Sequence, residues 1–350
     1  MKKNFLFTKS SEAHIRNKIS LLAFLASFFI LYAHNHNYDV YGISSESTGI
    51  LGITYAVEEY LNYIANYITT CLFFFISGFL FFRTFEINKL FEKYKSRLFS
   101  IVIPYLIWAS IYFLYYVTLT NIPFIKSHMN AEETVLFNFG NWLSWLWVDE
   151  YYTLWFLKYL IVYIALAPVI WLLLKNHFKK IPTGLIALVA MIVVFDSGII
   201  DFEYFERIDI YLVGAYIGLN LKDYIYYKNR ILSYVSLCFI FFMLVTSFRY
   251  FNIVTEVLFF LGFWYALDLI DFSDKKLPWW TGITFFTYVA HDAFLEPMKK
   301  IWGMFFGRIE VMALVEYLLL PVLLFVVLVV VAWIFRKLLP KTWQVLTGAR

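Results

Sequence analysis

Long apolar stretches separated by short polar segments dominate this 350-residue sequence. Most of these stretches approach the ~20 residues that an α-helix needs to cross a bilayer, so we interpret about ten of them as membrane-spanning helices. The predicted spans are residues 19–35, 61–82, 98–119, 154–174, 183–200, 208–221, 231–249, 252–270, 280–298 and 310–335. The pattern therefore predicts an all-α fold, a polytopic bundle of transmembrane helices.

A further apolar segment, residues 135–149, is too short and too rich in tryptophan to be counted as a membrane span, since it contains three tryptophans. Tryptophan is favoured at the level of the lipid headgroups. We therefore expect this segment to form an interfacial helix that lies along the membrane surface.

The composition is that of an integral membrane protein and disfavours a second sizeable soluble domain. Hydrophobic residues make up 62% of the chain and charged residues 15%, against about 45–50% and about 25% in soluble domains. No Gly/Ser-rich or Pro-rich linker interrupts the apolar stretches, so residues 1–350 are predicted to form a single membrane domain. Cys71 and Cys238 both lie in apolar runs, which favours buried thiols over a disulfide or a metal site.

The basic residues predict the orientation of the chain in the membrane. If the spans alternate, 22 of the 29 Lys and Arg residues lie in segments on one side. By the positive-inside rule this side is cytoplasmic, and both tails, residues 1–18 and 336–350, lie there. The opposite loops carry acidic residues, including Glu58 and Glu59. The first helix then ends at the outer side.

The first predicted helix ends in a polar cluster that contains His34 and His36. Imidazole can accept and donate a proton near neutral pH, so a histidine at this place is a candidate general base. The cluster could instead be no more than the water-facing end of the helix. If the helix continues, His36 points away from the face of His34, and we interpret His36 as a surface residue.

Few ionisable residues lie inside the other predicted spans, where an uncompensated charge costs about 2–3 kcal/mol. Lys158 and His291 are therefore candidate functional residues, with Asp292 beside them. Each has a structural alternative. Lys158 could extend to the outer interface, His291 could be a core residue bonded to a carbonyl of a neighbouring helix, and Asp292 could pair with a nearby cation.

Five stretches, taken in order, resemble the membrane-bound acyltransferase family 3. Besides the first helix ending at His34, they are FFFISGFLFF with the basic linker YKSRLFSIVIPYLIW, then TLWFLKYLIVYIALAP, YLVGAYIG and TFFTYVAHDAFLEP. Each motif alone is weakly specific, and the resemblance rests on their order and separations over nearly the whole chain. Members of this family are O-acyltransferases that modify glycans and other cell-surface or secreted molecules.

The resemblance carries over to individual positions. It implies that His34 is catalytic. A second motif of the family matches Arg97 followed by Pro104 and Tyr105. Two further motifs match Leu154, Trp155 and Phe156 followed by Lys158, and Phe286 and Tyr288 followed by His291. The sequence departs from the family pattern at two positions. Ala23 stands where the family usually has an arginine, eleven residues before the histidine, and Ser100 stands where a second basic residue often follows.

The resemblance implies acyl transfer from acetyl-CoA, or another acyl-CoA, to a hydroxyl of a cell-surface or lipid-linked glycan. His34 would act as the base, and Lys158 or Arg97 would stabilise the charge that develops on the carbonyl oxygen. The basic linker of Lys93, Lys95 and Arg97 would bind the CoA phosphates. The expected partners are this donor, the glycan acceptor and the lipid bilayer of the inner or plasma membrane, with no metal, no tightly bound cofactor and no nucleic acid.

Two other classes of function stay open. A transporter or flippase for a glycan or lipid often contains an internal repeat with matching ionisable residues in both halves, and the sequence shows no such repeat. A non-catalytic partner in polysaccharide export would keep the fold without the chemistry, and Ala23 in place of the family arginine favours this alternative.

The orientation can be tested with reporter fusions. A reporter after Lys179 and one after Arg350 should both report the cytoplasm, and one after Glu46 should report the outside, because the basic segments are retained inside. The paired activities of a phosphatase and a fluorescent reporter measure this. A C-terminus on the outside would contradict both the even number of spans and the placement of His34.

Overall fold

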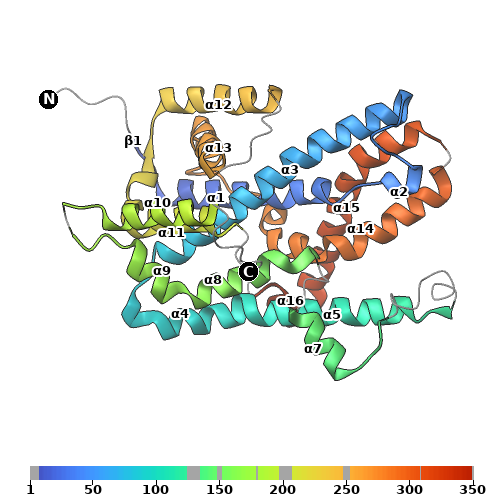
Figure 1. Ribbon diagram of the computed structural model, residues 1–350, viewed down its shortest axis with the longest axis horizontal. Coiled ribbons are helices and arrows are strands. Elements are labelled where there is room, and N and C mark those ends of the chain that lie inside the picture. Colours follow the sequence, from blue (N-terminus) through green and yellow to red (C-terminus); the bar gives the residue numbers. More distant parts are fainter. Residues whose placement is uncertain are drawn as a thin grey trace.

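The computed structural model describes residues 8–123, 135–147, 152–178, 180–196, 207–246, 253–307 and 309–348. Within these residues the chain is helical almost throughout, which confirms the prediction of an all-α fold (Figure 1). The first half contains α1 (Glu12–Ala33), α2 (Tyr38–Tyr41), α3 (Gly49–Phe82), α4 (Leu90–Arg97), α5 (Ile103–Thr120), α7 (Phe139–Trp147), α8 (Trp155–Ala165) and α9 (Ala167–Leu174). The second half contains α10 (Thr183–Asp196), α11 (Ile208–Tyr216), α12 (Arg230–Val245), α13 (Ile253–Ala266), α14 (Thr284–Phe306), α15 (Val311–Leu338) and α16 (Pro340–Thr347).

Short elements join or extend these helices. Five-residue π-helical turns, Leu98–Val102 and Ile217–Leu221, connect α4 to α5 and extend α11. A 3-10 turn, Trp279–Gly282, precedes α14. Two short strands, β1 (Thr8–Lys9) and β2 (Tyr227–Lys228), pair antiparallel. The remaining 3-10 turns are Ile87–Lys89, Tyr152–Leu154, Tyr224–Tyr226 and Leu267–Leu269.

The number of long apolar helices is lower than the ten spans predicted. Four helical segments in the described part are long and apolar enough to cross a membrane, namely Glu12–Tyr41, Gly49–Phe82, Ile87–Thr120 and Val311–Leu338. The pair α8 and α9 gives a fifth if it counts as one span. Each predicted stretch does contain a helix, but several of these helices, such as α10 and α12, have fewer than 18 residues. Hydropathy located these helices, but fewer of them than predicted are long enough in the described part of the chain to cross a membrane.

The predicted span 154–174 is bent rather than continuous. Its two halves, α8 and α9, meet at an angle of 64° around Leu166. Pro168 lies in the first turn of α9, where its missing N–H costs no helical hydrogen bond, whereas in the middle of a straight helix its ring would clash with the preceding turn. The proline therefore accounts for a break that hydropathy does not reveal.

The segments predicted on the cytoplasmic side gather at one end of the bundle. Arg83, after α3, donates to Glu12 of α1 over 2.7 Å, and Lys228 of β2 lies 3.6 Å from Asp271. The pairing of β1 with β2 adds the N-terminal segment to this group. The structure thus brings together the connections that the charge pattern assigned to one side, and that this side is cytoplasmic stays a prediction.

The segments predicted on the outer side meet at the other end. Tyr38 donates to Glu59 over 2.8 Å, and Lys299 of α14 donates to the carbonyl of His36 over 3.1 Å. Glu58, which we expected in an outer loop, lies inside α3 with its side chain fully buried. The prediction was wrong because α3 begins at Gly49, twelve residues before its apolar part, and its polar first turns pack against the loop that follows α1.

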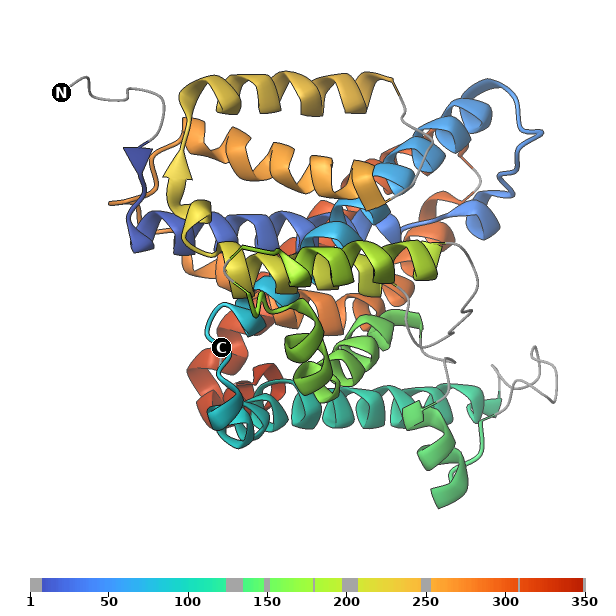
Figure 2. The ribbon, with the colours of Figure 1, turned by 60° about the vertical axis from the view of Figure 1, so that its left-hand side comes forward.

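The helices α1, α3, α8 and α14 surround the centre of the bundle. In Figure 2 the helix α12, in gold, lies at one edge of the molecule, and α5 with α7, in teal and green, lies at the opposite edge. Trp142 of α7 donates to Ser110 of α5 over 3.0 Å, so the predicted interfacial segment is a helix docked on α5. The predicted C-terminal tail contains α16, whose Trp343 is buried against Phe286.

Glycines allow α3 and α11 to approach each other closely. A Cβ atom added at Gly78 would overlap the carbonyl of Tyr211, and one added at Gly214 would overlap the carbonyl of Phe75. Gly218, four residues after Gly214 and on the same helix face, also lies against the α3 backbone. Small residues at a spacing of four are the usual means by which membrane helices pack backbone to backbone.

We predict that Gly78→Ala and Gly214→Ala each destabilise the protein by about 1–3 kcal/mol, because the added methyl group must push two helix backbones apart. The melting temperature of the purified protein measures this. Gly282→Ala is the matched control, since nothing lies within 4 Å of a Cβ atom there. Equal melting temperatures for Gly78→Ala and Gly282→Ala would contradict the close packing of α3 and α11.

Candidate functional site

A cavity of about 360 Å³ lies between α1, α3, the turn after α4, α8 and the start of α14, and is called the main cavity below. This volume is within the range of small-molecule sites. Most of its lining is apolar, and its polar side chains are Ser20, Ser77, Arg97, Thr281, Thr284 and Tyr288. An apolar cavity with a few hydroxyls and one cation suits a long, flexible ligand that has a negative charge at one end.

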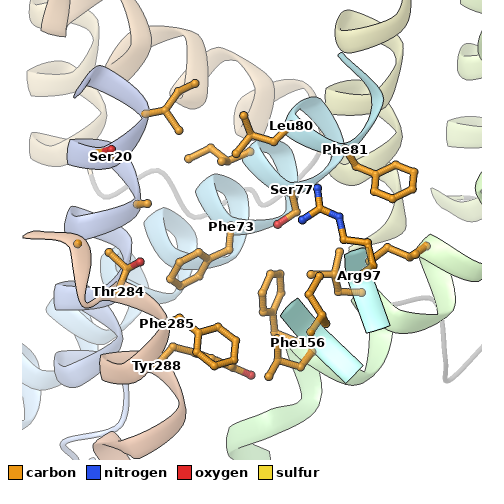
Figure 3. A pocket seen from close by; sticks show the side chains of 18 of the residues that line it. Ser20, Phe73, Ser77, Leu80, Phe81, Arg97, Phe156, Thr284, Phe285 and Tyr288 are labelled. Carbon is orange, nitrogen blue, oxygen red and sulfur yellow. The ribbon is translucent and has the colours of Figure 1, made fainter. Parts of the chain in front are cut away.

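Arg97, at the end of α4, supplies this cation. Its guanidinium reaches toward Ser77 across the cavity (Figure 3) and lies 5.5 Å from the centre of the Phe81 ring. The other two predicted phosphate ligands lie outside the cavity lining. Lys93 donates to the carbonyl of Phe81 over 3.1 Å and to Thr84 over 2.7 Å, and Lys95 is exposed.

His34 lines a second, smaller pocket of about 30 Å³, called the His34 pocket below. Helix α1 ends at Ala33, and His34 caps it by donating its backbone N–H to the carbonyl of Ile30 over 3.2 Å. The prediction that the first helix ends at this histidine is therefore confirmed. His34 is partly buried, which disagrees with a helix end fully in water.

The structure brings His34 and His291 together. Their ring centres are 4.9 Å apart with the planes inclined by 60°. His291 is fully buried in α14, and its Nδ1 lies 2.7 Å from the carbonyl oxygen of Tyr288. Because a carbonyl only accepts, this nitrogen carries the proton and the ring's Nε2 has a lone pair. That Nε2 makes no hydrogen bond within the described part of the chain.

The two charged candidates near the histidines are placed differently. Lys158 of α8 is only 4% exposed, so it does not extend to the interface, and it lines neither the main cavity nor the His34 pocket. Asp292, beside His291, accepts a hydrogen bond of 3.1 Å from the hydroxyl of Thr153. This bond connects α14 to the start of the Leu-Trp-Phe motif.

His36 lies in the loop after α1, so the expectation that it shares a helix with His34 does not hold. Its Nδ1 is 3.9 Å from Glu58, and its ring is partly exposed. Glu58 and Glu316 are fully buried near this loop, Glu58 beside His36 and Glu316 beside Tyr41. That these two carboxylates lie near the same loop could not be predicted from the sequence, because α3 and α15 are far apart in the chain.

Three aromatic side chains line both the main cavity and the His34 pocket, namely Phe73, Phe156 and Tyr288. Figure 3 shows Phe156 near Arg97, with Phe73 and Tyr288 further along the cavity. Sequence analysis assigned no role to them. All three lie in the family-like motifs, but aromatic residues are so frequent here that their positions alone give no signal.

The comparisons with known proteins identify the family. The sequence pattern described as "Acyltransferase domain", of acyltransferase family 3, matches residues 16–337. The chain belongs to acyltransferase family 3. The matched region of the acyltransferase includes His34, Arg97, Lys158 and His291. No curated protein and no solved structure matches the chain.

Ala23, where the family usually has an arginine, lines the main cavity. We therefore predict that Ala23→Arg folds and inserts normally, because the new guanidinium would enter the cavity and not the lipid. Ala26→Arg, one turn further along α1, is the matched control. Ala26 is fully buried against α3, where its carbonyl accepts a hydrogen bond from Thr69.

An arginine at position 26 would lack both space and a partner, at a cost of at least about 2.5 kcal/mol. The yield of monodisperse protein in size-exclusion chromatography measures both variants. If Ala23→Arg is lost as completely as Ala26→Arg, the cavity does not extend to this face of α1.

Proposed function

We propose that this acyltransferase transfers an acetyl group from acetyl-CoA to a hydroxyl of a cell-surface or lipid-linked glycan at the inner or plasma membrane. The observation that carries the proposal is the arrangement of the two cavities. The main cavity is lined by one cation, Arg97, and it shares three lining residues with the pocket of His34, whose ring is in contact with that of His291.

The main cavity suits the donor. At about 1.5 Å per helical residue, His34 lies more than about 20 Å along α1 from Arg16 and Lys18, so a donor that enters at that end must reach far into the bundle. The pantetheine arm of CoA is long and narrow enough to occupy an apolar cavity with scattered hydroxyls. Arg97 would bind a phosphate of CoA, and Lys93 and Lys95, on the same helix, add positive charge beside it.

The chemistry requires a base beside the acceptor hydroxyl. In the proposed reaction His34 removes the proton of the glycan hydroxyl, the oxygen attacks the thioester carbonyl carbon, and the bond from carbon to sulfur breaks. The CoA sulfur then receives the proton from His34. His291 supports this role, because its ring lies in contact with that of His34. Lys158, which is buried on α8 and lines neither cavity, would contribute its positive charge only from a distance.

Purified protein in nanodiscs should release CoA from acetyl-CoA when it is given glycan extracted from the cells that make the protein. Free thiol measures CoA release, and mass spectrometry of the glycan measures the added acetyl group. Movement of a glycan or lipid across liposomes without any CoA release would instead support a transporter. Binding of acetyl-CoA without turnover would support a non-catalytic partner.

The histidines can be separated by substitution. His34→Ala should lower turnover by about 10²–10⁴-fold with the protein still folded, because a positioned base contributes this much. His36→Ala is the matched control and should retain most activity, since it lies in the loop and lines neither cavity. Full activity of His34→Ala would rule out histidine base catalysis from this helix.

His291→Ala distinguishes catalysis from packing. Loss of turnover with a normal melting temperature would assign His291 to the reaction, whereas loss of the folded protein would make it a core residue. The result expected here is loss of turnover, because its Nε2 takes no part in the hydrogen bonds of the described core.

A further inference from the structure

Phe73, Phe156 and Tyr288 line both the main cavity and the His34 pocket, so their rings lie between the two spaces. Their ring centres form a triangle with sides of 5.4, 5.6 and 6.1 Å, so each ring contacts the other two. A thioester that reaches from the main cavity toward His34 must pass this point, which is called the aromatic junction below. Tyr288 is the one of the three that carries a polar group.

The hydroxyl of Tyr288 is available as a hydrogen-bond donor. The Tyr288 side chain is buried, and its hydroxyl proton has no acceptor among the described residues. The two threonine hydroxyls of the His34 pocket are already engaged, since Thr69 donates to the carbonyl of Ala26 over 3.3 Å and Thr70 donates to that of Asn66 over 2.7 Å. A buried hydroxyl proton without an acceptor carries a free-energy cost, and a ligand that accepts it at the junction would remove this cost.

The start of α8 makes the surroundings of this hydroxyl favourable for negative charge. The backbone N–H groups of Phe156 and Leu157, in the first turn of α8, approach the Tyr288 oxygen. The first turn of a helix carries partial positive charge from its backbone dipoles. Tyr288 is also fixed relative to the histidines, because its own carbonyl accepts the proton of His291 Nδ1 one turn along α14.

We propose that Tyr288 is a further catalytic residue, whose hydroxyl donates a hydrogen bond to the carbonyl oxygen of the acyl thioester held at the aromatic junction. This inference rests on the proposed function and adds the group that receives the developing charge. When the acceptor oxygen attacks, negative charge forms on the carbonyl oxygen and strengthens this hydrogen bond. Tyr288 keeps its proton throughout, and the acceptor proton still passes through His34 to the CoA sulfur.

Tyr288→Phe tests the hydroxyl alone, because the ring and the junction stay in place. We expect kcat at saturating acetyl-CoA, with a fixed amount of the glycan extract, to fall by about 10²–10³-fold, as for loss of one donor to an oxyanion. The KM for acetyl-CoA and the Kd for CoA should stay within about twofold of the wild-type values, because the hydrogen bond strengthens only in the transition state. The melting temperature should stay within a few degrees.

Tyr211→Phe is the matched control. The hydroxyl of Tyr211 is also buried without a hydrogen-bond partner among the described residues, and this residue of α11 lines neither the main cavity nor the His34 pocket. Its kcat should stay unchanged. If the wild type is active and Tyr288→Phe and Tyr211→Phe have the same kcat, the role of Tyr288 is wrong and the acyltransferase proposal still stands. A wild type that releases no CoA would overturn both.

A spectroscopic measurement can test the hydrogen bond from Tyr288 to the thioester carbonyl without any glycan acceptor. Infrared difference spectra of bound acetyl-CoA, labelled with ¹³C at the carbonyl, should show a lower carbonyl stretching frequency in the wild type than in Tyr288→Phe. If Tyr288→Phe does not fold, 3-fluorotyrosine introduced at position 288 replaces it. Its more acidic hydroxyl should lower the frequency further, and an unchanged frequency would overturn the proposal.

Discussion

The close contact between α3 and α11 determines where the cavity wall lies. Gly78 allows the α3 backbone to meet α11, and Phe73, Ser77 and Leu80 line the main cavity from the other face of α3. Those three residues are spaced by four and three, so they form one stripe of the helix. A larger residue at the glycine would move the whole stripe, and with it the aromatic junction, toward the cavity. Packing at a distance from the chemistry thus controls the width of the passage.

Buried polar groups in this bundle fall into two kinds. Near the start of α1, Lys18 donates to Asp268 over 2.6 Å and His14 lies 3.0 Å from the same carboxylate, so these groups compensate one another and fix α1 to the segment after α13. Around the aromatic junction the hydroxyl proton of Tyr288 has no acceptor, and Nε2 of His291 makes no hydrogen bond, in the described part of the chain. A fold retains such groups at a cost, which is why they are the strongest structural support for chemistry at this place.

Much of the local structure could be predicted from the sequence, and much of the site could not. The apolar runs located the long helices but not α2, α4 or α16, and the polar cluster correctly placed the end of α1 at His34, because hydropathy changes abruptly there. The same reasoning failed for Glu58, since a helix can continue through polar residues that a neighbouring loop covers. The contact of His34 with His291 joins positions 257 residues apart, and periodicity within one helix carries no information on such pairs. Only the order of the family-like motifs pointed to it, and the role of Tyr288 required the cavities themselves.

The sizes of the two cavities bear on which acyl group is transferred. The His34 pocket holds about 30 Å³, close to the volume that one water molecule occupies in the liquid, whereas the main cavity is an order of magnitude larger. If the thioester carbonyl lies at the aromatic junction, the acyl chain beyond it must fit in the smaller space or separate the rings. An acetyl group adds a single methyl beyond the carbonyl, while each further methylene would press against Phe73, Phe156 or the histidine. On the proposed placement of the thioester, the small volume of the His34 pocket would accept an acetyl group more readily than a longer acyl chain.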